Sequence, residues 1–301
     1  MAAPPDLVTE PAVNLGFTSF YDGFAKFTPG LAFIDYTRWQ DLTSLTTSKG
    51  TDVPGLNNPN IQAFINLLQF FWVAPIHVPG GGVGFDVLLP LVELSSSFTQ
   101  PGGNLRANGF ATGDLNFGPF YQSAPMKLFG HLFSWRTEFD IIAPSGGFNP
   151  HRDINQSSGF WSLNPYVAFT YLPVSGWEIS ARLWYLHNFT TNRISNPPFN
   201  PLSPIETGQA GDAAWINFTT SYAISKPFAL GLNGYYFQQL GEDKINGQRL
   251  AHTIKNQVYL GPGVHWEISK TNIVNFNVYV PVTTHGVATG PQLNLQYIHP
   301  F

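Results

Sequence analysis

Apolar and polar side chains alternate along about twelve segments of roughly ten residues each, the length expected of tilted membrane strands. The last segment, residues 292–301, shows the pattern clearly. One set of alternate positions holds Leu293, Leu295, Tyr297 and Phe301, and the other holds Gln292, Asn294 and Gln296. Because successive side chains of a strand point to opposite faces, one face suits lipid and the other a wet lumen. The alternation therefore predicts strands of a β-barrel.

The connections between these segments alternate between short and long, as in a barrel with short periplasmic turns and long outer loops. The expected strands cover residues 31–44, 61–73, 83–94, 110–122, 133–143, 160–172, 177–189, 214–224, 228–239, 254–268, 272–282 and 290–301. The long loops cover residues 45–60, 95–109, 144–159, 190–213, 240–253 and 283–289. We therefore predict an all-β fold, a transmembrane antiparallel barrel of about 12 strands over residues 31–301, with both chain ends periplasmic.

Composition favours a membrane wall over a soluble surface. Only 11% of the residues are charged and 15% are aromatic, whereas soluble domains average about 25% charged residues. The net charge of -4 and the lack of a basic run argue against nucleic-acid binding. The start of the chain has no basic or apolar signal region, so we expect a mature chain with an added Met. A soluble β-rich carbohydrate-binding protein is the alternative.

Inward positions of the expected strands combine charged and aromatic side chains. The predicted lumen-lining residues are Arg136, Glu138, Asp140, Tyr166, Glu178, Arg182, Trp184, Trp215, Tyr235, Phe237, Lys255, Tyr259, His265, Glu267 and Tyr279. The charges most often neutralise one another across a narrow lumen. The aromatic rings either fill the barrel or let a small aromatic solute stack and shed water.

Residues 1–30 form a leader that is too aromatic to be left in the periplasm. Its aromatic side chains are Phe17, Phe20, Tyr21, Phe24 and Phe27. A disordered leader and a short amphipathic piece packed under the barrel are two alternatives. We expect instead that part of the leader folds into the lumen as a plug, because inward aromatic side chains offer it an apolar partner.

Five prolines fall inside expected strands, where proline removes a donor from the hydrogen-bond ladder. They are Pro90, Pro119, Pro165, Pro262 and Pro281. They mark either bulges that curve the wall or a lateral seam between the third and fourth strands, where Pro90 and Pro119 are expected close together. A seam would let an apolar solute leave sideways into the membrane.

No pattern of residues supports catalysis, a metal or a cofactor. The chain has no cysteine, and its eight histidines show no metal-ligand spacing. We expect no enzyme. An outer-membrane lipase is a further alternative, although the spacing of Ser, His and Asn singles out no catalytic trio.

Several short motifs occur in an order that resembles a known family. They are residues 29–31 (PGL), 113–120 (GDLNFGPF), 160–165 (FWSLNP), 171–172 (YL), 176–181 (GWEISA), 234–239 (GYYFQQ), 261–262 (GP) and 300–301 (PF). Together they resemble the outer-membrane channel family associated with the meta-pathway of phenol degradation. The loop 190–213, with four prolines, departs from that family.

The resemblance implies a monomeric barrel of about twelve strands in the outer membrane of a Gram-negative bacterium. It would serve as a channel for passive uptake of small hydrophobic or aromatic molecules, including aromatic growth substrates. The partners implied are outer-membrane lipid, the hydrophobic solutes, and the barrel-assembly machinery, whose recognition signal the carboxyl-terminal Phe301 resembles.

Overall fold

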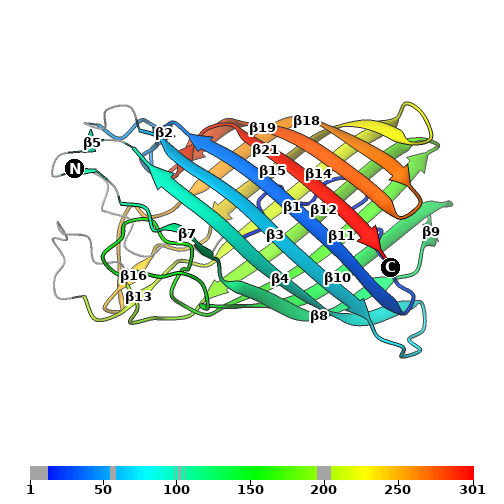
Figure 1. The fold of residues 1–301 in the computed structure, drawn as a ribbon, viewed down its shortest axis with the longest axis horizontal. Helices are drawn as coiled ribbons and strands as arrows, with labels where there is room; N and C mark the ends of the chain where they lie inside the picture. Colours follow the sequence, from blue (N-terminus) through cyan, green and yellow to red (C-terminus); the bar gives the residue numbers. More distant parts are fainter. Residues whose placement is uncertain (1–12, 55–58, 98, 101–102, 105, 195–204) are drawn as a thin grey trace.

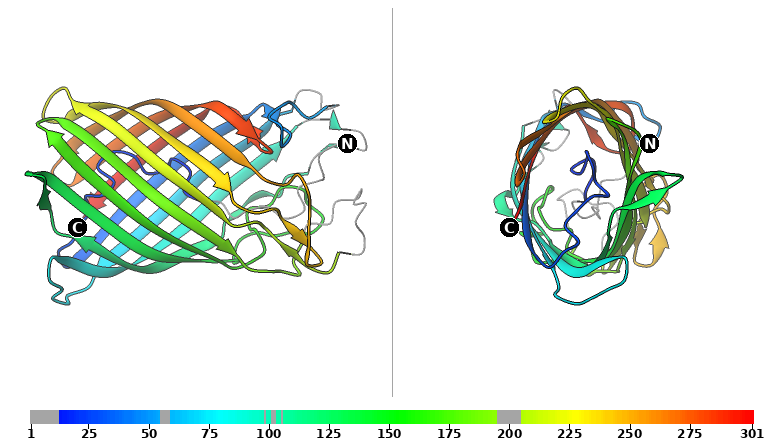
Figure 2. Two further views of the ribbon diagram at one scale, coloured as in Figure 1. Left: turned by 180° about the vertical axis from the view of Figure 1, so that it is seen from behind. Right: turned by 90° about the vertical axis from the view of Figure 1, so that its right-hand side faces the viewer.

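The computed structural model describes the 301-residue chain except residues 1–12, 55–58, 98, 101–102, 105 and 195–204. Twelve antiparallel strands close into a barrel, because the first wall strand pairs with the last (Figures 1 and 2). The wall strands are β1 (Gly30–Leu42), β3 (Ile61–Val73), β4 (Gly81–Ser96), β8 (Leu115–Ser123), β10 (His131–Ala143), β11 (Ser162–Val174), β12 (Trp177–Asn188), β14 (Ala213–Ala223), β15 (Phe228–Gln239), β18 (Asn256–Ser269), β19 (Asn272–His285) and β21 (Gln292–Pro300). The predicted fold class is confirmed.

Shorter strands either extend the wall or form small separate sheets. They are β2 (Ser44–Leu45), β5 (Thr99–Gln100), β6 (Gly103–Asn104), β7 (Gly109–Thr112), β9 (Met126–Leu128), β13 (Gly208–Gln209), β16 (Lys244–Ile245), β17 (Gln248–Arg249) and β20 (Ala288–Thr289). Strand β7 continues the fourth wall strand, and β9 pairs with β10 at the short-turn end. Strands β2 and β20 pair with each other, and so do β5 and β6, while β13, β16 and β17 form a small sheet of their own.

The fourth strand is interrupted, although the sequence pattern predicts it as one piece. It divides into β7 and β8 at Gly113 and Asp114. The Asp114 carboxylate is buried and accepts hydrogen bonds from Gly146 N (3.1 Å) and from Ser158 N and Oγ (2.9 and 2.8 Å). These bonds connect the strand to the following long loop, so the interruption anchors that loop over the barrel.

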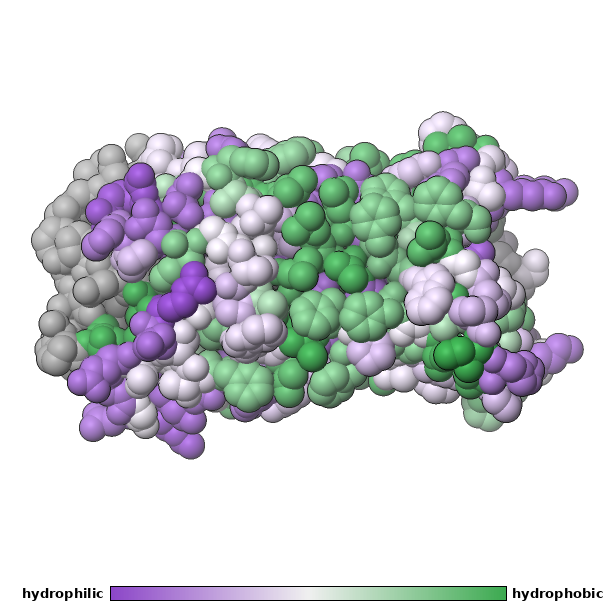
Figure 3. All heavy atoms as spheres, turned by 60° about the horizontal axis from the view of Figure 1, so that its bottom comes forward, coloured by the Kyte–Doolittle hydropathy of each residue, from purple (hydrophilic) through white to green (hydrophobic). Residues whose placement is uncertain are grey.

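The outer face of the wall is apolar, as contact with lipid requires. Figure 3 shows hydrophobic residues across the middle of one face and hydrophilic residues toward both ends. Near the short turns, Trp177, Tyr222 and Trp266 are exposed, where an aromatic girdle belongs. Among the described residues, no helix has the length and apolar character to cross a membrane.

The two ends of the described chain lie in different parts of the barrel. Phe301 is at the short-turn end, where its N–H donates to Leu31 O (3.0 Å). Val13, the first described residue, lines the cavity near the long loops together with Val287 and Lys255. The N-terminal segment therefore runs through the lumen before it enters β1, and the amino-terminal end of the chain, which we expect in the periplasm, lies outside the described residues.

Proline interrupts the strand pairing on one side only. Pro119 lies opposite Phe85 in a continuous β4–β8 ladder, whereas on the β10 side the pairs made by Phe120 and Phe117 flank a gap. Pro262 of β18 likewise sits in a continuous ladder with β15 and beside a gap in the ladder with β19. The cause is the missing proline N–H, which leaves one neighbour without a donor.

Pro90 and Pro119 do not adjoin, so the expected seam between the third and fourth strands is wrong in its placement. Pro119 faces Phe85 across the ladder rather than Pro90. Pro90 is buried and lines the lumen, whereas Pro119 is exposed on the outer face. At Pro90 the wall is also held together, because its carbonyl accepts a hydrogen bond from Gly113 N (2.9 Å). A one-residue irregularity between β7 and β8 also shifts the register with β4.

Candidate functional site: the lumen and its N-terminal segment

Residues 13–29, called here the N-terminal segment, cross the lumen as an irregular chain (Figure 2, right, dark blue). The part of the segment nearer the long loops is hydrogen-bonded to the wall through its backbone. Trp215 Nε1 donates to Asn14 O (2.9 Å), Gly16 N donates to Asn217 Oδ1 (3.0 Å), and Asn294 Nδ2 donates to Gly16 O (2.7 Å). Gly16 has φ +71°, and an added Cβ would lie 2.7 Å from the Tyr235 ring, so only glycine fits this crossing.

The part of the segment nearer the short turns is held by charged and polar side chains of the wall. Asp22 forms an ion pair with Arg182, with Arg182 Nε 2.8 Å from Asp22 Oδ2. Gly23 N donates to Thr170 Oγ1 (2.8 Å), and Gln122 Nε2 donates to Gly23 O (2.9 Å). The N–H of residue 21 donates to the carboxylate of Glu178. The barrel thus satisfies backbone polar groups at both ends of the lumen crossing, as a chain inside a protein requires.

The aromatic side chains of the segment pack inside the barrel. The Arg38 guanidinium carbon lies over the Phe17 ring, 3.7 Å from the ring centroid. The Phe17 and Tyr36 rings meet edge to face, with their centroids 6.1 Å apart. Phe17 also belongs to a buried cluster with Leu67 of β3. This contact accounts for the apolar inner face of β3 at Ile65 and Leu67.

The remaining aromatic residues of the segment lie further down the lumen. Phe20 and Tyr21 contact the His265 ring, with centroids 5.7 and 4.9 Å apart. Phe24 lines the cavity at the short-turn end. The carbonyl of Phe27 lies against Gly82, where a Cβ would approach within 2.2 Å. The N-terminal segment therefore touches the wall along its whole described length.

Two cavities remain beside the segment. The outer chamber, toward the long loops, measures about 260 Å³, and the inner chamber, toward the short turns, about 460 Å³. Gln69, Tyr166 and Arg182 line both chambers. These three side chains mark the layer in which the two chambers meet, which we call the constriction layer.

A chain of buried polar contacts surrounds the constriction layer. Tyr36 Oη donates to Gln69 Oε1 (2.8 Å), and Gln69 in turn donates to the Asp86 carboxylate. Arg136 Nη2 lies 3.1 Å from Asp86 Oδ2. Asp86 and Arg136 are both buried. Charges in such a place are tolerated because they are paired and hydrogen-bonded.

The chain of contacts continues on β10 and β11. Arg136 Nε donates to Glu138 Oε2 (2.9 Å), and Tyr166 Oη donates to the same oxygen (2.6 Å). The Arg182 guanidinium lies over the Tyr166 ring, 4.2 Å from its centroid. The layer therefore combines fixed charges of both signs with an aromatic surface.

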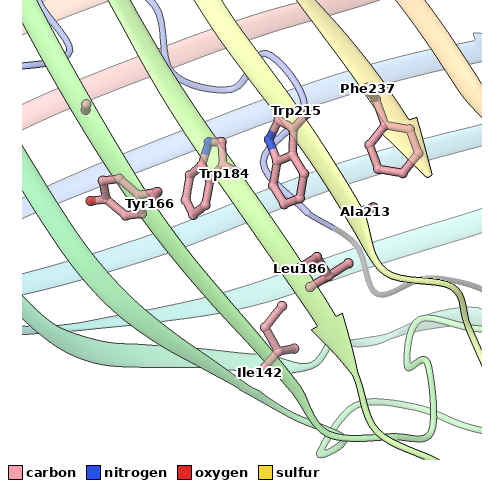
Figure 4. Close-up of a cluster of buried hydrophobic side chains, with 8 residues drawn as sticks. Ile142, Tyr166, Trp184, Leu186, Ala213, Trp215 and Phe237 are labelled. Atoms are coloured by element: carbon pink, nitrogen blue, oxygen red, sulfur yellow. The ribbon is translucent and has the colours of Figure 1, made fainter. Parts of the chain in front are cut away.

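An inward-facing row of aromatic rings begins at this layer (Figure 4). Successive ring centroids are 4.2 Å apart for Tyr166 and Trp184, 5.3 Å for Trp184 and Trp215, and 6.1 Å for Trp215 and Phe237. The row crosses β11, β12, β14 and β15. Tyr166 lies well inside β11, whereas Phe237 lies near the long-loop end of β15, so the row climbs from the constriction layer toward the outer rim.

The other predicted tyrosines form a separate cluster. Tyr235 and Tyr259 stack with centroids 5.0 Å apart, and Tyr279 meets Tyr235 at 5.8 Å. All three rings are buried, and Leu15 of the N-terminal segment packs on them. These rings fill the space between the wall and the segment.

The structure buries every predicted lumen residue except Glu267, whose side chain is 54% exposed at the inner chamber. Sequence reasoning missed Asp22, Arg38 and Asp86. Arg38 carried a usable signal, because it shares an inward position with Tyr36 in an expected strand. The described residues include no cluster of His, Asp and Glu that could hold a metal ion.

The closed barrel, its apolar outer face and its chambered lumen have the form of an outer-membrane channel. A family model described as "Putative MetA-pathway of phenol degradation" matches residues 43–297. The chain belongs to this family, as its motifs predicted, and it resides in the outer membrane.

Comparison with solved structures finds other chains with a similar fold. An outer membrane channel from Pseudomonas putida F1 is 14% identical with a TM-score of 0.76, covering 93% of this chain and 98% of that chain. The TodX monoaromatic hydrocarbon channel, as a deletion mutant, is 7% identical with a TM-score of 0.44, covering 94% and 93%. The KdgM porin with oligogalacturonate is 9% identical with a TM-score of 0.43, covering 89% and 99%. The first of these establishes the shared fold. No curated protein matches the chain.

Proposed function

We propose that the protein is a channel for passive uptake of small hydrophobic or aromatic molecules across the outer membrane. The observation that carries this proposal is the row formed by Tyr166, Trp184, Trp215 and Phe237, which climbs from the constriction layer to the outer rim. A pore for ions or sugars gains nothing from such rings, whereas a small aromatic solute can stack on Tyr166, Trp184 and Phe237, which line the outer chamber, and shed water.

The N-terminal segment is the plug of this channel. Its backbone is bonded to the wall on several strands, and its aromatic side chains reduce the lumen to the outer and inner chambers. We infer that it acts as a fixed constriction, because releasing it would break the Asp22–Arg182 ion pair and many backbone hydrogen bonds together. A solute then passes between the segment and the wall through the constriction layer.

We infer that the channel works as a monomer surrounded by lipid, with the solute moving along the barrel axis into the periplasm. The closed ladder supports this, since β1 pairs with both β21 and β3 over most of its length. The carboxyl-terminal strand, which ends in Phe301, would be the contact for the barrel-assembly machinery.

Uptake of an apolar fluorescent probe by intact Gram-negative cells tests the proposal, because their outer leaflet slows hydrophobic solutes. Phe237→Ala should slow uptake relative to the wild type. Tyr236→Ala is the matched control, since Phe237 is buried in the lumen and its neighbour Tyr236 is 42% exposed on the outer face. If cells with the wild-type channel take up no more probe than cells without it, the proposal is refuted.

A further inference from the structure

The ladder between β1 and β21, called here the closing ladder, differs from the other ladders of the described wall. It joins strands from opposite ends of the chain, whereas each of the others joins wall strands that are consecutive in the sequence (Figure 1). Bringing such distant segments together has an entropic cost. The strand β21 is also short, with 9 residues against 13 in β1 and 14 in β19. Contacts that reach across the closing ladder therefore contribute directly to closure of the barrel.

Two side chains that face each other in this ladder also bind the N-terminal segment. Arg38 of β1 lies opposite Asn294 of β21, and both side chains are buried. Arg38 Nε donates to Asn294 Oδ1 (2.7 Å). Arg38 Nη2 also donates to Leu15 O, and Asn294 Nδ2 donates to Gly16 O (2.7 Å). The two strands and two consecutive carbonyl groups of the segment are thus joined in one ring of hydrogen bonds.

Arg38 needs the segment because its charge is buried without a carboxylate partner. It is 3% exposed and forms no ion pair within the described part of the chain. An unpaired buried charge is costly. The segment offsets this cost twice, because Leu15 O accepts a hydrogen bond from the guanidinium and the Phe17 ring lies against it. Without the segment, Arg38 would keep only its bond to Asn294 among these contacts.

A second contact reaches across the closing ladder at the short-turn end. Lys26 Nζ donates to Phe301 O (3.0 Å), which directly follows β21. The Lys26 side chain also packs on Gly30, the first residue of β1, where an added Cβ would lie 2.8 Å from Lys26 Cε. This contact is exposed to solvent, so it contributes less than the buried ring of hydrogen bonds at Arg38.

We propose that the N-terminal segment has a second role, as a clasp that holds the closing ladder together from the lumen side. The segment is continuous with β1 along the chain and is hydrogen-bonded to Asn294 of β21 and to Phe301. It therefore tethers the last wall strand to the first, in place of the turn or loop that connects the strands of the other wall ladders. This role concerns the wall and not the passage, so it holds for any solute that the channel carries.

Hydrogen–deuterium exchange, measured by mass spectrometry on the purified full-length channel, tests the clasp because exchange reports the local opening of each strand. Phe17→Leu keeps the apolar bulk and removes the ring that contacts Arg38. It should raise exchange in β1 and β21 about fivefold, the effect of losing a cation–π contact. Phe20→Leu is the matched control, since Phe20 is also buried but contacts His265 of β18. It should leave exchange in β1 and β21 at the wild-type level.

A disulfide across the closing ladder should reverse the effect of Phe17→Leu. Thr37 and Leu295 are paired in that ladder on the face opposite Arg38, and the chain has no cysteine. With Thr37→Cys and Leu295→Cys added, the oxidised Phe17→Leu channel should show wild-type exchange in β1 and β21, and the reduced channel should show the raised exchange.

A matched disulfide elsewhere in the wall controls for general stabilisation. Leu183 and Ile216 are paired in the ladder between β12 and β14. Leu183→Cys with Ile216→Cys should leave the raised exchange of β1 and β21 unchanged, whether the disulfide is oxidised or reduced. Equal restoration by the two disulfides would overturn the clasp, because the effect would then not lie at the closing ladder.

Unchanged exchange in β1 and β21 of Phe17→Leu would also overturn the clasp, and so would an equal rise in all wall strands. The heat-dependent gel shift checks that each variant is folded. A Phe17→Leu channel that folds only with the oxidised closing disulfide would support the clasp. One that folds with neither disulfide, while Phe20→Leu folds, would overturn it. Each of these results leaves the proposed uptake of apolar solutes standing, since that proposal is tested separately in cells.

Discussion

Asp22 of the N-terminal segment and Arg182 of β12 form an ion pair across the lumen, with both side chains less than 10% exposed. Within the described structure, this is the ion pair that links the N-terminal segment to β12 at the constriction layer. A charge in a narrow, poorly hydrated passage is weakly screened. The pair therefore holds the segment in place and balances the local charge that a passing ion experiences.

Removing either partner should shift ion selectivity, in opposite directions. Asp22→Ala leaves Arg182 uncompensated and should favour anions, whereas Arg182→Ala leaves Asp22 uncompensated and should favour cations. Reversal potentials in a salt gradient across a planar bilayer measure the shift. Leu183→Ala, at a side chain exposed on the outer face, is the control and should leave the potential unchanged. A shift of the same sign in both charge variants would contradict this assignment.

Arg136→Ala should also favour cations, because it leaves the buried Asp86 and Glu138 carboxylates without their partner. Breaking a buried ion pair from one side costs about 3–5 kcal/mol, so this variant should also lose its heat-dependent gel shift at a lower temperature. Reversal potentials and gels on the same preparation check both effects. An unchanged potential in a folded Arg136→Ala channel would show that its guanidinium does not face the ion path.

Deletion of residues 4–27 should raise single-channel conductance, because the described part of this stretch, residues 13–27, occupies the lumen beside the two chambers. Unchanged conductance in a folded barrel would refute the plug. A disulfide between Ser19→Cys and Asn277→Cys then separates a fixed plug from a mobile one, since Asn277 Nδ2 donates to Ser19 Oγ (3.1 Å) and the chain has no other cysteine. We expect the same conductance before and after reduction of the disulfide. A rise on reduction would mean that the plug moves.

The fold could be predicted from the sequence because its signal is local. Alternation along each strand separates buried Asn275, Asn277 and Tyr279 from their outward neighbours without knowledge of any other strand. The interior is different, because its contacts depend on register. The row of Tyr166, Trp184, Trp215 and Phe237 arises only after four strands align, although each ring was predicted to face inward.

The polar contacts of the constriction layer were less accessible to sequence reasoning. Asp86 reaches Arg136 across the intervening strand β8, and Asp22 reaches Arg182 from an irregular segment with no periodicity. The placement of Pro90 and Pro119 failed because it depends on the register between β4 and β8, which pairs Pro119 with Phe85. A periodic pattern along each strand contains no information about that register.

The ladder gap beside Pro119 should be sealed by close packing of the backbone. A Cβ on Gly118 would lie 2.1 Å from Phe139 O of β10, so only glycine fits this approach of the two strands. Gly118→Ala should therefore destabilise the barrel by about 1–3 kcal/mol, the usual effect of forced overpacking. The midpoint of the heat-dependent gel shift measures it. Gly241→Ala is the control, because a Cβ there meets no atom within 4 Å, and equal midpoints for the two variants would contradict the seal.

A sealed wall also predicts the route by which a solute leaves the channel. Pro119→Val supplies a backbone N–H toward β10 and should close any lateral opening at the gap. Since we expect axial exit, uptake of an apolar fluorescent probe and ion conductance should both stay at wild-type values. A fall in probe uptake with conductance preserved would instead establish lateral exit into the membrane, now located between β8 and β10. Pro90→Val distinguishes the two prolines, because Pro90 lies on β4 and not beside the gap between β8 and β10, so its replacement supplies no N–H to that gap and should not close a lateral opening there.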